Sequence, residues 1–243
     1  MDFHPPIIEP EVFDLVQYEM KQRKASGKWV SAAHCFSGKI FCGECGSLYG
    51  SKLQHGKSKY KRMMWQCNQA ASSRIKCKTP QLTDKQVQEA FIAVINKLIA
   101  NKAVIEQAFK EMLFILTDNT KLEARHNDLQ DEYDVVREMI RKLIEENATT
   151  TLDQKEYQRQ YNSFTERYVI LKERLVEINE QIQERAAKRT NMKRFMEAIK
   201  SQKRLITKFD EELWFATVKS AEITATNEMC FSFRDGSNKI VRL

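Results

Sequence analysis

Four of the six cysteines in this 243-residue chain stand at a spacing that suits a metal ion. Cys42-Gly-Glu-Cys45 is a CxxC pair, Cys67 follows after 21 residues, and Cys77 follows after nine more. Two thiolates in a tight turn can face one ion, and a second pair from a neighbouring hairpin completes a tetrahedron of sulfur ligands. The pattern predicts a zinc ribbon holding one structural Zn²⁺, with no open coordination position for catalysis.

The rival interpretations of the cysteines concern the fourth ligand and redox chemistry. Because the second pair is spaced more loosely than the first, His34, Cys35 and His55 stay open as replacements for Cys77. His55 is interpreted as part of a basic loop, and Cys35 and Cys230 as small buried residues. A thioredoxin-like CxxC site follows a βαβ pattern, which this sequence does not show, and stable disulfides are disfavoured in the cytosol.

Zinc matters to folding because the cysteine segment is short. A β module of about 40 residues buries too little core to be stable by itself. A structural zinc ion contributes on the order of 10 kcal/mol to the folding of such units. We therefore expect that metal removal unfolds the module.

Positive charge is concentrated around the cysteines. Between Met20 and Thr83, thirteen Lys or Arg stand against one acid, Glu44, so this segment carries +12 and the rest of the chain −5. Such segregation creates a positive field suited to a polyanion, whereas a basic face that serves only solubility is the alternative. The segment from Ser51 to Arg62 resembles a hairpin with a basic turn, of a width that enters a DNA major groove.

The residues predicted to contact DNA are the cationic and polar side chains of this segment. Phosphate contacts are assigned to Lys52, Lys57, Lys59, Lys61 and Arg62, and base-edge contacts to Gln54, His55 and Arg62. Arg74, Lys76 and Lys78, near the last cysteine, complete the predicted set.

Short strands and helices must position these groups. The stretch 36–77 holds five of the seven glycines, which favours short strands and tight turns. Residues 7–24 predict a helix with Pro10 in its first turn and with Phe13, Val16 and Met20 on one face. Thr83 is the predicted N-cap of a helix whose apolar positions are Val87, Phe91, Val94, Ile95 and Leu98.

Two heptad stripes follow in the middle of the chain. The first lies on a helix predicted to run unbroken from near Lys102 to about Asn147, and the second on a helix capped by Asp153 and Glu156. The stripes are Leu122, His126, Leu129, Tyr133, Val136, Ile140 and Leu143, and Tyr157, Tyr161, Phe164, Tyr168, Leu171, Leu175, Ile178 and Ile182. They predict an antiparallel coiled-coil hairpin about 45 Å long with its tip near 148–152, although an intermolecular coiled coil is an alternative.

The C-terminal tail predicts a return to β structure. Phe209 and Leu213 are expected to staple a short helix that starts near Asp210. Strands are predicted at Ile223–Thr226, Met229–Phe233 and Lys239–Leu243, with Asp235-Gly236 as a hairpin turn. We expect these strands to complete the cysteine module, so that the fold class is α+β, with a zinc β ribbon into which the helical hairpin is inserted.

The motifs resemble those of large serine recombinases, the integrases and transposases of phages and mobile elements. FSGKIFCGECGSLYG, the run from Tyr60 to Cys67, Cys77 and the helix start TDKQVQEAF resemble their zinc β ribbon. HPPIIEPEVFDLVQ resembles the end of the preceding recombinase domain, and FDEELWFATVKSAEI with FSFRDGSNKIVRL resembles the close of these proteins. The resemblance implies three parts: 1–30 as the end of the recombinase domain and linker helix, 31–101 with 208–243 as the DNA-binding zinc domain, and 102–207 as the coiled-coil arm.

The resemblance also implies the function. We expect a non-catalytic fragment of a cytoplasmic site-specific recombinase, whose catalytic serine domain precedes Met1 and which binds double-stranded attachment-site DNA and pairs subunits. No signal peptide or membrane span is expected. The expected partner contacts near the tip of the coiled coil are Ile140, Leu143, Tyr157 and Tyr161, where a recombination directionality factor would also act. The alternative function is a zinc-ribbon coiled-coil adaptor with no DNA role.

Overall fold

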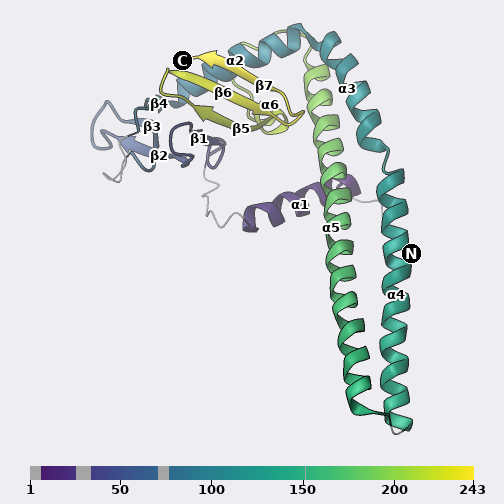
Figure 1. The fold of residues 1–243 in the computed structure, drawn as a ribbon. Coiled ribbons are helices and arrows are strands. Elements are labelled where there is room, and N and C mark those ends of the chain that lie inside the picture. The colour runs from purple at the N-terminus through teal and green to yellow at the C-terminus, as the bar shows by residue number, and fades with distance from the viewer. Residues whose placement is uncertain (1–6, 26–33, 71–76, 151) are drawn as a thin grey trace. The chain divides into compact units, whose positions relative to one another are not determined.

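The computed structural model describes residues 7–25, 34–70, 77–150 and 152–243. The chain divides into two compact units. We call the described residues of Met1–Leu113 and Lys188–Leu243 the β unit, and Phe114–Ala187 the arm. The arm is therefore an insertion in the β unit (Figure 1).

The β unit contains a four-stranded sheet in the order β1-β5-β6-β7. Its strands are β1 (Ile40–Cys42), β5 (Val218–Ile223), β6 (Glu228–Phe233) and β7 (Asn238–Arg242). β1 pairs with β5 in parallel, with Ile40 opposite Ala221. The C-terminal strands thus complete the cysteine module, as the sequence predicted, and the α+β fold class is confirmed.

The first C-terminal strand was predicted at the wrong residues. The sequence placed it at Ile223–Thr226, but β5 ends at Ile223 and the following residues form the turn into β6. The turn is closed by the amide of Thr224, which donates to the carbonyl of Glu228 at 3.0 Å, and Asn227 has a φ of 62°. A left-handed residue in this position favours a tight turn over a continued strand.

A second sheet carries the rest of the cysteine segment. Its three strands are β2 (Tyr49–Gln54), β3 (Arg62–Cys67) and β4 (Leu82–Thr83), in that order. β4 leads directly into α2 (Asp84–Ala100). Thr83 caps this helix in a capping box with Gln86, which confirms the predicted N-cap.

The core of the β unit lies where α2 meets the first sheet. The five apolar positions predicted for this helix are all buried: Val87, Phe91, Val94, Ile95 and Leu98. The ring of Phe91 lies 5.3 Å from that of Trp214 and 5.6 Å from that of Phe209, measured between centroids. Edge-to-face packing of these aromatic rings forms the centre of the core around Trp214.

The helix α6 (Glu211–Thr217) begins as predicted. Asp210 is its N-cap and accepts a hydrogen bond from the amide of Leu213 at 2.9 Å. The ring of Trp214 also packs near Phe209 across this cap, with centroids 6.1 Å apart. The staple joins the residue before the cap to the fourth helical position, which is Trp214.

The helix α1 (Pro10–Ala25) starts at the predicted proline but buries a different face. Leu15 is 3% exposed, whereas the predicted apolar face of Phe13, Val16 and Met20 is exposed. The carboxylate of Glu19 accepts a hydrogen bond from the guanidinium of Arg234 at 2.6 Å. This polar contact, one turn after Leu15, helps to select the buried face of α1. Apolar periodicity alone cannot predict that choice.

The helix predicted from Lys102 to Asn147 is in fact two helices. α3 (Lys102–Thr117) ends before Asp118-Asn119, and α4 (Thr120–Thr149) begins after them. The guanidinium of Arg185 donates to the carbonyls of Ile115 at 2.6 Å and Asp118 at 2.9 Å. Because these carbonyls are satisfied by a side chain from another helix, α3 can stop here without leaving them unpaired.

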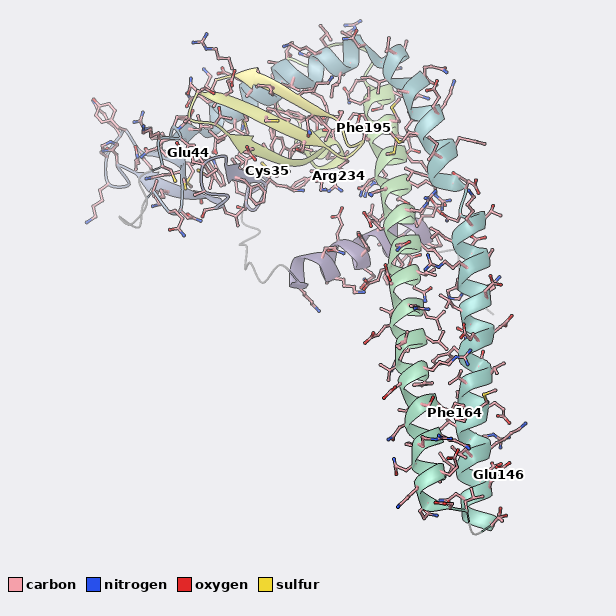
Figure 2. The ribbon with its side chains drawn as sticks, viewed as in Figure 1. Cys35, Glu44, Glu146, Phe164, Phe195 and Arg234 are labelled. Atoms are coloured by element: carbon pink, nitrogen blue, oxygen red, sulfur yellow. The ribbon has the colours of Figure 1, made fainter. Side chains whose placement is uncertain are left out.

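The arm is an antiparallel hairpin of α4 with the first part of α5 (Gln154–Ser201), drawn side by side in Figure 1. The predicted stripe residues pack within one chain, and those buried in the shared cluster are Leu129, Val136, Leu171, Leu175 and Ile178. Phe164 packs against this cluster and lies between the helices (Figure 2). The hairpin interpretation is therefore confirmed. No described helix is both long and apolar enough to cross a bilayer.

Candidate metal centre and nucleic-acid interface

Cys42 ends β1, and Cys45 lies in the turn between β1 and β2. The amide of Gly46 donates to the carbonyl of Cys42, and the amide of Cys42 to that of Ser47, both at 2.8 Å. Gly46 has a φ of +67°, which glycine adopts without strain. A Cβ at position 43 would lie 3.0 Å from the carbonyl oxygen of Ile223, so Gly43 lets this turn approach β5 closely.

The four predicted cysteines come together. The sulfur atoms of Cys42, Cys45, Cys67 and Cys77 all lie within 4.8 Å of one another. In a tetrahedral site with Zn–S bonds of about 2.3 Å, the sulfurs are roughly 3.8 Å apart. The sulfurs of Cys45 and Cys67, 3.5 Å apart, already approach that separation. Four sulfurs without a carboxylate match the donor set that zinc prefers, so this cluster can bind one Zn²⁺.

The acid inside the CxxC pair links the two halves of the cluster. The carboxylate of Glu44 accepts a hydrogen bond from the amide of Lys78, the residue after Cys77. Glu44 is labelled in Figure 2 in the same turn as the first two cysteines. Sequence reasoning counted Glu44 only as a charge. Glu44 is the one acid between Met20 and Thr83 in the sequence. That isolation is the signal that could have pointed to its hydrogen bond with Lys78.

The cysteine thiols differ in acidity because their surroundings differ. Hydrogen bonds from the side chain and backbone of Ser47 lower the pKa of Cys45 to about 6. Burial raises the pKa of Cys67. Cys45 is thus the sulfur that most readily offers a thiolate, and the charge of a bound metal ion favours deprotonation of the others.

The three alternative ligands lie outside the cluster. Cys35 is 8% exposed, and burial raises its pKa to about 12. His34 stands between the rings of Phe36 and Trp65, with its Nε2 3.5 Å from a carboxylate oxygen of Asp84. His55 lies in the turn after β2, with a φ of 53°. Cys77 is therefore the fourth member of the cluster.

The basic hairpin, which we define as residues 49–67, carries five cations and no acid. β2 and β3 pair antiparallel, and hydrogen bonds from the amides of Ser58 and Lys61 order the turn between them. The cations exposed on it are Lys52, Lys57, Lys59, Lys61 and Arg62. No acidic residue occurs between Glu44 and Asp84 in the sequence, so nothing within the hairpin neutralises this charge.

The pairing of β2 with β3 sorts the hairpin into two faces. Lys52 is opposite Met64, and Gln54 is opposite Arg62, so these four share one face because directly paired residues point the same way. The amide of Gln54 also donates to Gln81 at 3.1 Å. Three of the residues predicted to contact DNA, Lys52, Gln54 and Arg62, therefore lie on one face of the hairpin.

The remaining predicted residues are placed as follows. His55 and Lys78 are exposed, and Arg74 and Lys76 lie outside the described residues. At the tip of the arm, Leu143 is 6% exposed and Ile140, Tyr157 and Tyr161 are half-buried. The rings of the two tyrosines stack with centroids 5.9 Å apart.

Comparison with known proteins identifies the cysteine segment. Residues 35–96 match the family described as the recombinase zinc beta ribbon domain, and all four clustered cysteines fall within this match. The resemblance of this segment to a recombinase zinc ribbon is therefore confirmed, together with its capacity for one zinc ion.

The other two comparisons are less specific. No curated protein matches the chain. Among solved structures, one described as a crystal structure of an LSR–DNA complex matches with a TM-score of 0.30 and 15% identity. The match covers 99% of this chain and 66% of that one, so this chain spans just under two thirds of the length of the matched protein.

Proposed function

We propose, from the premise that residues 35–96 are a recombinase zinc beta ribbon domain, that this chain binds attachment-site DNA for a site-specific serine recombinase. The strand-cleaving chemistry is assigned to a separate catalytic domain. The observation that carries this proposal is the exposed basic hairpin. The four-cysteine cluster lies at the end of the hairpin away from its turn.

The hairpin suits duplex DNA in size and charge. A major groove about 12 Å wide admits a two-stranded β ribbon. Exposed lysines around the turn can neutralise phosphates, whereas Gln54, His55 and Arg62 carry the donors and acceptors that base edges require. Zinc enters this function through structure, because Cys67 ends β3 and Cys45 precedes β2, so that metal binding holds both strands in register.

A salt titration tests DNA binding. Each phosphate contact steepens the fall of log K with log salt by about 0.9. The triple variant Lys57→Ala, Lys59→Ala, Lys61→Ala should reduce this slope by up to about 2.7, measured by fluorescence anisotropy with a 30-base-pair duplex. A matched control removes three exposed cations of the arm with Lys121→Ala, Lys172→Ala and Arg174→Ala. Weak or salt-independent binding by the wild-type chain would favour the alternative, an adaptor without a DNA role.

We further propose that the arm pairs DNA-bound subunits through its tip. Support comes from Tyr157 and Tyr161, which two helices leave half-buried. A second arm could bury their remaining apolar edges, and a recombination directionality factor would act at the same surface. Ile140, which is also predicted at the tip, is half-buried as well. Leu143 is buried inside the hairpin, so we expect it to contribute to the stability of the arm.

Substitution of the tip tyrosines tests this pairing. Tyr157→Ala or Tyr161→Ala should leave the Kd for DNA unchanged but reduce the formation of paired complexes, observed as slower bands in a mobility-shift assay. Val169→Ala, which shortens an exposed apolar side chain on the same helix, is the control. Unchanged pairing by both tyrosine variants would contradict a role for the tip.

A further inference from the structure

A second group of cations lies away from the hairpin, in the loop between α5 and α6. This basic loop, residues 202–210, has Lys203, Arg204 and Lys208 exposed within nine positions. In the described part of the chain, none of the three forms an ion pair. The nearby Lys200, by contrast, is paired with Glu106 at 2.8 Å. With the exposed acid Asp210 at its end, the loop carries a net charge of +2.

Contacts at three residues, Ile206, Phe209 and Asp210, hold the loop in place. The side-chain amide of Asn96 donates to the carbonyl of Ile206, and the amide of Ile206 donates back to Asn96, both at 2.9 Å. Phe209 packs into the aromatic core, and Asp210 caps α6. Since the backbone is fixed at both its middle and its end, the cations project from an ordered frame, and binding a ligand costs little ordering of the chain.

The shape of the loop indicates an extended ligand. Its nine residues surround a shallow hollow of about 530 Å³, open to solvent, with Leu205 exposed on its wall. Sites for small molecules enclose most of the ligand surface, which this hollow does not. Three cations around an open hollow suit the edge of a long polyanion.

The basic loop and the basic hairpin belong to one compact unit. Thr83, at the start of α2, lies in the strand that pairs with β3, and Asn96, 13 residues further on, holds the loop. At about 1.5 Å per residue, these two points are roughly 20 Å apart along the helix. Both anchors therefore belong to one helix, which holds the loop at a fixed distance from the second sheet.

We infer that the basic loop is a second DNA-backbone contact, in which Lys203, Arg204 and Lys208 bind phosphates of the same duplex that the hairpin enters. This inference rests on the proposed DNA-binding function. It assigns the loop to phosphates, because the exposed cations Lys203, Arg204 and Lys208 flank the exposed aliphatic side chain of Leu205.

The test removes the three cations without touching the anchors of the loop. In the triple variant Lys203→Ala, Arg204→Ala, Lys208→Ala, Asn96, Ile206 and Phe209 remain, and an unchanged circular dichroism spectrum would verify the fold. We expect the affinity at 0.1 M salt to fall at least about tenfold and the salt slope to decrease by up to about 2.7. The control is the arm variant Lys121→Ala, Lys172→Ala, Arg174→Ala.

Hydroxyl-radical footprinting locates the contact. With a duplex selected by the wild-type chain from a randomised pool, we expect two separate clusters of protected sugars, one for the hairpin and one for the loop. The loop variant should lose only one cluster, and the variant of Lys57, Lys59 and Lys61 should lose the other.

The outcomes separate the two proposals. A loop variant that matches the arm control in affinity, slope and footprint, while the hairpin variant is weakened, overturns the loop contact and leaves the proposed function standing. Absence of duplex binding by the wild-type chain overturns both. If the loop variant bound DNA as tightly as the wild-type chain but no longer bound polyglutamate, the ligand of the loop would be an acidic protein. That outcome would overturn the assignment to phosphates.

Discussion

The arm and the β unit differ in how far along the chain their contacts reach. In the arm, the hydroxyls of Tyr133 and Tyr168, 35 residues apart, are hydrogen-bonded at 2.7 Å. In the β unit, the indole of Trp214 donates to the carbonyl of Cys35, 179 residues away. The arm can therefore fold from neighbouring helices, whereas the β unit needs segments far apart in the sequence to come together.

Zinc removal should separate the two regions most strongly. Chelation, or Cys67→Ser, removes on the order of 10 kcal/mol from the β unit and should abolish the near-ultraviolet circular dichroism of the buried Trp65 and Trp214. The helical signal of the arm should persist in the far ultraviolet. Cys230→Ser, outside the cluster, is the matched control. A tryptophan signal that survives loss of zinc would show that the metal is not needed for this fold.

A core cavity should weaken the β unit by a smaller amount. Phe91 is fully buried against Phe209 and Trp214, so Phe91→Ala should destabilise the unit by about 3–5 kcal/mol in urea unfolding followed by tryptophan fluorescence. Phe114→Ala removes a ring that is 79% exposed and should change stability by less than about 0.5 kcal/mol. Equal effects of the two substitutions would contradict the aromatic core described above.

The corresponding substitution in the arm should leave the zinc ribbon intact. Leu171 is 2% exposed in the seam between α4 and α5, and Leu171→Ala should cost the arm about 3 kcal/mol, measured by ellipticity at 222 nm. Zinc content and tryptophan fluorescence should not change. If they were lost together with the helical signal, the two regions would be one cooperative unit and the comparison would fail.

The capping box should give the smallest effect. Thr83 both pairs with Met64 in the second sheet and caps α2, so Thr83→Ala should destabilise the β unit by about 1 kcal/mol. Thr83→Ser retains the capping hydroxyl and should recover most of this loss. A serine variant as unstable as the alanine variant would assign the effect to strand pairing and not to the cap.

Local signals predicted much of this structure. The heptad stripes, the CxxC turn and the caps at Thr83 and Asp210 each depend on residues within a few turns of one another, so their patterns can be recognised in the sequence. The same holds for the metal, because four thiols at ribbon spacing leave few other arrangements. The site residues on the basic hairpin remain predictions, although the structure exposes the described lysines among them.

Tertiary contacts decided what local patterns could not. The place of β5 depends on β1, the end of α3 on the guanidinium of Arg185, and the buried face of α1 on Arg234. Each partner is far away in the sequence, and a local pattern contains no information about where it will lie.

The amino-acid sequence by itself determined the zinc ligands, the helical hairpin and the concentration of charge near the cysteines, since spacing and periodicity specify these directly. Only the folded chain decided which strands join, where the helices break, and that Asn96 holds a second cationic loop in the same unit as the first. The physical reason is that these features need hydrogen bonds and packing between distant segments, which form only once the chain has closed on itself.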